Sequence, residues 1–345
     1  MKFSLFTLPL VLSLALFSVP SVSAAPSDHE AYEPLAVVKA SITNQLSEGE
    51  IQKLPDGTQL VGADYFTVRI EGADKNGPDV VLIPGLATPG DVWNKTAAQL
   101  KDRYRVHIIQ IRGFGDLAPV DNPLPEGKTH FDDYIHEVAD YIDDYVMGEM
   151  KGSKPAIIGH SLGGLTAMAL AARAPQVVDK AMLVDSLPFG ALIFDLEATV
   201  DAFKPQAEQM RNALAAQSRM TSVPWIMEGM SATAVGRKQV EAWAAMSDPK
   251  VAAAFLHDLM TTDMRPLLPQ ITVPMTMLYP IHEITISEQK ITNDHGEDYE
   301  AVYAGAKTMT FEKVEGSRHF IMLDQPDAFA AAVEKFLKPQ DGNDM

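Results

Sequence analysis

The sequence predicts a single α/β domain with a mostly parallel central sheet and an inserted helical segment. Short apolar runs at residues 80–83, 106–110 and 156–158 are each soon followed by glycine, and a helical pattern lies between the last two. This alternation breaks after residue 185, and a stretch of helical patterns rich in Ala and Met extends from residue 187 to about residue 270 without a clear strand signal. A chain of 345 residues suits one such sheet that carries an insertion.

The individual elements follow from periodicity and from the position of glycine and proline. The predicted strands are residues 59–61, 65–70, 80–83, 106–110, 156–158, 181–184, 274–278 and 308–311. The predicted helices outside the insertion are residues 131–146, 162–172 and 326–337. The first two strands form a hairpin-like pair, and the later ones alternate with helices, as expected for parallel strands joined by crossovers.

Composition narrows the classes of function. With 46% hydrophobic and 21% charged residues, the chain can bury a large core. The formal net charge of −18 repels phosphate backbones and disfavours nucleic acid as a partner. The absence of cysteine excludes disulfides, thiolate metal sites, a cysteine nucleophile and a lipid-modified cysteine anchor.

The first 24 residues resemble a cleavable export signal. Lys2 supplies the positive start, residues 8–17 form an apolar run, and Val22-Ser23-Ala24 has the small side chains of a cleavage site. Pro9 and Pro20 bracket a run shorter than the roughly 20 residues that a membrane anchor needs. We therefore expect a mature chain of residues 25–345 that is periplasmic or secreted, without a stable membrane anchor.

The segment Gly159-His160-Ser161-Leu162-Gly163 predicts a catalytic serine. It matches the pattern G-x-S-x-G and lies directly between a predicted strand and a predicted helix, which is the context that this motif requires. The serine must occupy a tight, strained turn, so side chains at Gly159 and Gly163 would collide. We expect Ser161 to be the nucleophile.

A serine hydroxyl needs an imidazole to accept its proton, and His319 is the histidine that fits this role. It lies in Gly316-Ser317-Arg318-His319-Phe320, after the last predicted strand and before the final helix. A loop in that place can reach the carboxyl edge of the sheet. None of the other histidines forms a metal-ligand signature, and the segment 294–298 lacks the spacing of a calcium loop, so we expect no metal site.

Several motifs together resemble the α/β-hydrolase superfamily, in the branch that holds esterases, lipases and proline iminopeptidases, across residues 60–338. Ile83-Pro84-Gly85-Leu86 is similar to the His-Gly-x turn of that family, and Ile111-Arg112-Gly113-Phe114-Gly115 to its Arg-Gly-x-Gly loop. Gly316–His319 with Asp324-Gln325-Pro326 is similar to its histidine region. The resemblance implies an α/β-hydrolase fold with an oxyanion hole made by the backbone N–H groups of Leu86 and Leu162.

The chain departs from the family pattern at two positions. Pro84 replaces the usual histidine, and Gln110 stands where an aspartate often opens the Arg-Gly loop. Because the oxyanion donors are backbone groups, the first departure bears on substrate preference more than on the chemistry.

Two carboxylates compete for the role of the acid that orients His319. The family pattern places the acid a few residues after the strand that begins near Val273-Pro274, which puts Glu283 in this position, with Pro280 replacing a glycine. Asp185, at the end of the preceding strand, is the alternative. The resemblance favours Glu283.

These residues predict an exported serine hydrolase that cleaves carboxylic esters of a small-molecule substrate through an acyl-enzyme on Ser161, without metal, nucleotide or flavin. The alternatives are a lactonase, a carbon–carbon hydrolase or an aminopeptidase with the same triad, or a non-catalytic binding protein of the same fold. We expect the insertion, residues 187–270, to lie as a helical lid over the catalytic edge. Its methionines either line an acyl pocket or pack the lid against the body. The natural substrate, its acyl chain length and the oligomeric state stay open.

Overall fold

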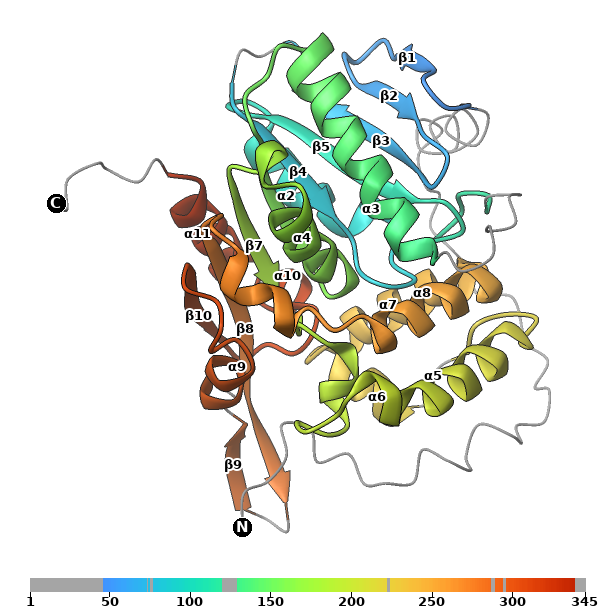
Figure 1. The fold of residues 1–345 in the computed structure, drawn as a ribbon, viewed down its shortest axis with the longest axis vertical. Helices are drawn as coiled ribbons and strands as arrows, with labels where there is room; N and C mark the ends of the chain where they lie inside the picture. Colours follow the sequence, from blue (N-terminus) through green and yellow to red (C-terminus); the bar gives the residue numbers. More distant parts are fainter. Residues whose placement is uncertain are drawn as a thin grey trace, which may run out of the picture.

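A central sheet organises the structure, a computed structural model that describes residues 46–72, 74, 77–119, 129–221, 224–286, 289–293 and 296–338. Nine strands follow in the order β1-β2-β3-β5-β4-β6-β7-β8-β10, and β9 pairs with β8 alone (Figure 1). β1, β2, β3 and β5 pair antiparallel, whereas β5, β4, β6, β7, β8 and β10 are parallel. The predicted α/β-hydrolase fold with a mostly parallel sheet is confirmed.

The bounds of the elements agree closely with the sequence pattern. The strands are β1 (Ile51–Lys53), β2 (Gln59–Gly62), β3 (Phe66–Glu71), β4 (Asp79–Ile83), β5 (Arg105–Ile111), β6 (Ala156–His160), β7 (Lys180–Val184), β8 (Met275–Ile286), β9 (Gln289–Asn293) and β10 (Met309–Glu315). The helices are α2 (Asn94–Leu100), α3 (His130–Asp140), α4 (Leu162–Arg173), α5 (Val200–Ala215), α6 (Pro224–Met230), α7 (Ala234–Met246), α8 (Pro249–Thr261), α9 (Gly296–Val302), α10 (Ile321–Asp324) and α11 (Pro326–Leu337).

Helices cover both faces of the sheet, and each face has its own hydrophobic core. Along β4, Val81 and Ile83 belong to one core, and Val80 and Leu82 belong to the other. This alternation follows from the two-residue period of a strand, and both faces are apolar because both are covered. α3 and α4 contribute to the first core, whereas α2, α10 and α11 contribute to the second.

The structure differs from the sequence prediction in three places. β8 continues to Ile286 and forms a hairpin with β9, whereas the sequence predicted a strand that ends near residue 278. The helix predicted over residues 131–146 is α3 followed by a π-helical segment, Tyr141–Glu149. The short elements β1, α2, α9 and α10 were not predicted, because segments of three to seven residues carry little periodicity.

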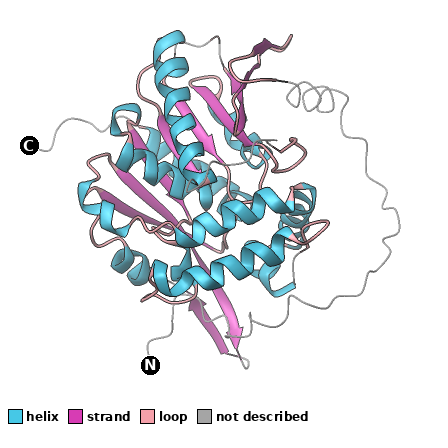
Figure 2. Ribbon diagram, turned by 45° about the vertical axis from the view of Figure 1, so that its right-hand side comes forward, coloured by secondary structure: helices cyan, strands magenta, loops and turns pink. Residues whose placement is uncertain are grey.

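The segment between β7 and β8 is helical, as predicted. It contains α5, α6, α7 and α8, which gather beyond the end of the sheet toward which β8 runs (Figures 1 and 2). Since β6 and β7 are parallel to β8, this is also the end that carries the carboxyl termini of those strands. Within the described part of the chain, none of the helices combines the length and the hydrophobicity needed to span a bilayer.

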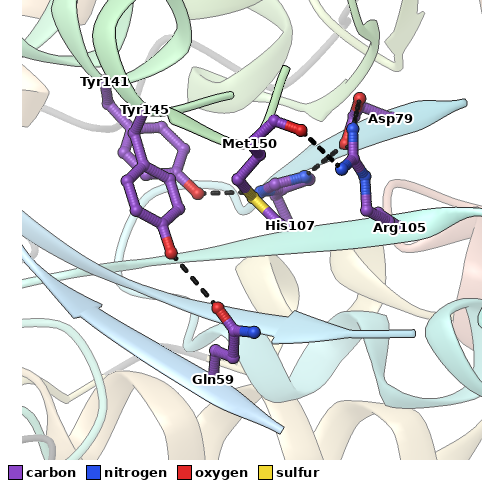
Figure 3. Close-up of polar contacts among 7 residues, drawn as sticks. All are labelled: Gln59, Asp79, Arg105, His107, Tyr141, Tyr145 and Met150. Atoms are coloured by element: carbon purple, nitrogen blue, oxygen red, sulfur yellow. Dashed lines mark hydrogen bonds and ion pairs between the residues drawn. The ribbon is translucent and has the colours of Figure 1, made fainter. Parts of the chain in front are cut away.

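A buried polar cluster lies at the opposite end of the parallel strands, where β4 and β5 begin (Figure 3). The carboxylate of Asp79 accepts hydrogen bonds from Arg105 Nε (2.8 Å) and Nη2 (2.6 Å) and contacts His107 Nε2 at 2.9 Å. The other ring nitrogen of His107 lies 2.7 Å from the hydroxyl of Tyr141. The side chains of Asp79 and His107 are fully buried, and burial lowers the pKa of His107. The carboxylate of Asp79 is therefore the shared polar partner of Arg105 and His107.

We predict that Asp79→Asn lowers the free energy of unfolding by about 3 kcal/mol, because it leaves the guanidinium of Arg105 buried without its counter-charge. Urea denaturation of the purified protein measures this loss. Glu312→Gln is the matched control: it also removes one carboxylate of an ion pair, but its partner Lys335 is 72% exposed, so we expect a change below about 1 kcal/mol. Equal, small changes in both variants would contradict the prediction.

Candidate functional site

Ser161 occupies a sharp turn between β6 and α4. Its φ angle is 53°, a left-handed conformation that non-glycine residues adopt only under strain. The turn requires glycine on both sides: a Cβ added to Gly159 would lie 2.0 Å from the backbone oxygen of Gly163, and one added to Gly163 would lie 2.2 Å from the backbone oxygen of Ile83. The two glycines of the motif therefore permit the close approach of strand, turn and helix.

The backbone of Ser161 is fixed by the residues that end β7. Its N–H donates to the carbonyl of Val184 (3.0 Å), and its carbonyl accepts from the hydroxyl of Ser186 (2.8 Å). Between these two residues lies Asp185, which also has a positive φ of 45°. One three-residue segment therefore supports the turn and presents a carboxylate beside it.

Asp185 and His319 are brought together. His319 Nδ1 lies 2.7 Å from Asp185 Oδ2, and both side chains are only partly exposed, His319 to 24% and Asp185 to 11%. The other carboxylate oxygen, Oδ1, accepts a hydrogen bond from the hydroxyl of Tyr299 in α9. Burial raises the pKa of this phenol well above its usual range, so Tyr299 remains a donor. Asp185 is therefore positioned to orient the ring of His319.

His160, the residue before Ser161, contacts the same histidine. Its ring centroid lies 4.5 Å from that of His319, and its Nε2 lies 3.0 Å from the backbone carbonyl of His319. A carbonyl can only accept, so Nε2 carries the proton. The side chain is fully buried, and burial lowers its pKa well below the usual range, which keeps it neutral. The contact places the imidazole of His319 next to the turn that carries Ser161.

The two residues predicted to supply oxyanion donors belong to chain segments that adjoin Ser161. Leu162 is the first residue of α4, where a backbone N–H has no partner within the helix. The loop after β4 passes close to the serine, because a Cβ added to Gly85 would lie 3.2 Å from Ser161 Cβ. Leu86 follows Gly85 in this loop, and the N–H of Thr88 closes a turn onto Gly85 O at 3.3 Å. The arrangement offers a developing negative charge the start of a helix and a second backbone segment.

The backbone around Glu283 differs from what the family pattern suggests. The pattern expects the acid in a loop after the strand, but β8 continues past this position, and the backbone of Glu283 pairs with that of Thr292 in β9. The ring of His319 is hydrogen-bonded to Asp185, the other candidate acid. Asp294 and His295, in the acidic turn of the sequence, lie outside the described residues. Among the residues that are described, no cluster of His, Asp and Glu could hold a metal ion.

Sequence reasoning missed three groups around the site. Tyr299 belongs to the seven-residue helix α9, and Ser186 follows the candidate acid, with its carbonyl accepting from the hydroxyl of Tyr303 (2.9 Å). His160 lies inside the serine motif itself. Its position next to Ser161 was a usable signal, whereas nothing in the sequence connects Tyr299 with Asp185.

The methionines of the inserted segment mostly pack rather than line a pocket. Met260 and Met264 are buried in the first core, and others lie partly buried against the two cores: Met210, Met220, Met227 and Met230. Met246 is 52% exposed. It borders a cavity of about 350 Å³ between residues 115–119 and the inserted helices, and none of the candidate site residues lines this cavity. The packing role is therefore the one that the contacts support.

Comparisons with known proteins agree with this architecture. The model of the alpha/beta hydrolase family matches residues 80–332. A pimeloyl-[acyl-carrier protein] methyl ester esterase of Aliivibrio salmonicida (strain LFI1238) is 27% identical over 274 residues, which cover 77% of this chain and 94% of that protein.

Solved structures show the same fold. The enol-lactonase of Burkholderia xenovorans LB400 has a TM-score of 0.58 at 21% identity and covers 84% of this chain and 99% of its own. A thermophilic esterase of Thermogutta terrifontis has a TM-score of 0.59 at 18% identity, over 84% of this chain and 98% of its own. With a matching family model over most of its length and a sheet order that carries the serine turn at its centre, the chain belongs to the alpha/beta hydrolase family.

Proposed function

We propose that the protein is an exported serine hydrolase that cleaves carboxylic esters through an acyl-enzyme on Ser161. The observation that carries the proposal is the coincidence of a strained serine turn with a hydrogen-bonded His319–Asp185 pair at the same sheet edge. Left-handed φ angles at non-glycine residues persist only where the surrounding structure enforces them, and such residues cluster at active sites. Within the described residues four non-glycine positions have positive φ, and Ser161 and Asp185 are two of them.

In the proposed reaction, Ser161 attacks the ester carbonyl while His319 accepts its proton. Asp185 holds the imidazole through Nδ1, which leaves Nε2 to face the serine, and it stabilises the imidazolium that forms. The N–H groups of Leu86 and Leu162 stabilise the oxyanion of the tetrahedral intermediate. His319 then donates the proton to the leaving alcohol, and water releases the acid in the reverse sequence of steps.

The substrate class to test follows from the name of a relative and from the chemistry of the His319–Asp185 pair. A relative at 27% identity is named a methyl ester esterase, so we propose esters of small alcohols with an apolar acyl group as the first substrates to test. Hydrolysis of a lactone uses the same steps on a cyclic ester. A panel of methyl esters, p-nitrophenyl esters and lactones separates the two activities by their kcat/KM values.

Ser161→Ala should reduce kcat for p-nitrophenyl acetate by on the order of 10⁶, because the nucleophile is lost while the fold is kept. The parent protein, but not the variant, should also be labelled covalently by a fluorophosphonate. Steady-state kinetics, with circular dichroism as the control for folding, measures both effects. Activity above a tenth of the parent value in protein free of contaminating esterase would contradict the assignment.

The two candidate acids predict opposite results. Asp185→Asn should lower kcat by about 10⁴, because the amide favours the wrong tautomer of His319. Glu283→Gln should change kcat by less than about threefold. If the glutamate variant lost activity and the aspartate variant retained it, the acid would be Glu283 after all.

Export is proposed from the first 24 residues, which lie outside the described part of the structure. A signal peptidase that cleaves after Ala24 leaves Ala25 as the first residue. Intact-mass measurement of protein from the periplasm or the culture medium should give the mass of residues 25–345. Recovery of a species that retains residues 1–24 from these fractions would contradict the proposal.

A further inference from the structure

The inserted helices are hydrogen-bonded to the loop that carries His319. The N–H of His319 donates to the carbonyl of Gly229 (3.3 Å), and the N–H of Phe320 donates to that of Met230 (2.9 Å). Arg318 adds a side-chain bond to the carbonyl of Glu228. All three acceptors belong to the last turn of α6, where helix carbonyls lack partners within the helix.

Asp324 makes the second half of this connection. Its Oδ2 accepts from the N–H of Ala232 (2.8 Å) and from that of Arg318 (3.0 Å), and its Oδ1 accepts from the hydroxyl of Ser231. Ser231 is fully buried. One carboxylate, at the end of α10, therefore accepts from two donors of the inserted segment and from one donor of the residue before His319. Hydrogen bonds to an ionised carboxylate are stronger than those between neutral groups.

His319 is thus fixed from three sides. Its N–H is bound by the inserted segment at Gly229, its carbonyl contacts His160 beside the nucleophile, and its ring is bound by Asp185. The first of these contacts comes from a segment that the sequence suggests is only a cover. Shifts of about 1 Å in a catalytic group can cost about a hundredfold in rate.

We propose that residues 228–232 of the inserted segment position the general base, acting through Asp324 and Ser231. This inference rests on the proposed function, because it assigns a role in the placement of His319. Neither Asp324 nor Ser231 touches the substrate in this role. The inserted helices therefore set the rate of the chemical step, and removing them would displace His319 as well as uncover the site.

Two variants test the proposal on the full mature chain. Ser231→Ala removes one donor to Asp324 and should lower kcat about tenfold, and Asp324→Asn weakens all three bonds and should lower it about a hundredfold. KM should change by less than about threefold. Since the loss acts on the base, kcat should fall by the same factor for acetyl, butyryl and octanoyl p-nitrophenyl esters. The rate of fluorophosphonate labelling of Ser161 should fall in parallel.

Thr199→Ala is the matched control. It also removes a hydroxyl from the inserted segment, where Thr199 caps α5 by accepting from the N–H of Ala202 (3.3 Å). It should leave kcat and the labelling rate within about twofold of the parent values, since this residue is remote in sequence from the histidine loop contacts.

The outcomes separate cleanly. A loss of kcat that depends on acyl chain length would assign the segment to the substrate pocket and would overturn the proposal. An equal loss of kcat in Thr199→Ala would reflect general loosening of the inserted helices and would also overturn it. If Asp324→Asn does not fold, Ser231→Ala alone decides. Unchanged labelling in a folded Ser231→Ala variant also overturns it. Full activity of Ser161→Ala would instead overturn the proposed function itself.

Discussion

The tight turn at Ser161 is the constraint around which the rest of the site is arranged. Without side chains at Gly159 and Gly163, β6 and α4 approach closely enough to place the serine above the sheet edge. A left-handed serine costs of order 1–3 kcal/mol, so the turn persists only because its surroundings fix it. The end of β7 does so through Val184 and Ser186, and the residue between them is Asp185. The same short segment therefore supports the turn and places the carboxylate that binds His319.

The two ends of the parallel strands carry polar groups of different kinds. At the amino ends of β4 and β5, the buried carboxylate of Asp79 binds the largely buried guanidinium of Arg105 and the buried ring of His107, so each charged group has a partner. At the carboxyl ends, the polar groups are partly exposed, and His319 has one ring nitrogen bound to Asp185. Buried, fully partnered charges stabilise one arrangement, whereas a group that must gain and lose a proton needs contact with substrate and solvent.

Local pattern predicted much of the fold and part of the site. Ser161 was recognisable because G-x-S-x-G followed an apolar run and preceded a small-residue helix, and β6 and α4 flank it in the structure. His319 was recognisable from its place after the last strand. The contacts of Asp185 with Tyr299, and those of Asp324 with the inserted segment, join residues 92 to 114 positions apart in the sequence. Such pairings depend on tertiary placement, which periodicity and spacing do not encode.

Asp185, directly after β7, is connected to the part of the chain in which the family pattern expects the acid. β8 continues past the expected position of the acid and reaches Ile286 as one arm of a hairpin. The chain after that hairpin forms α9, which brings the hydroxyl of Tyr299 to the free oxygen of Asp185. The region after β8 therefore contributes a donor to the carboxylate that binds His319. In the proposed mechanism, the chain after β7 supplies the acid, and the chain after β8 supplies the hydroxyl that binds its second oxygen.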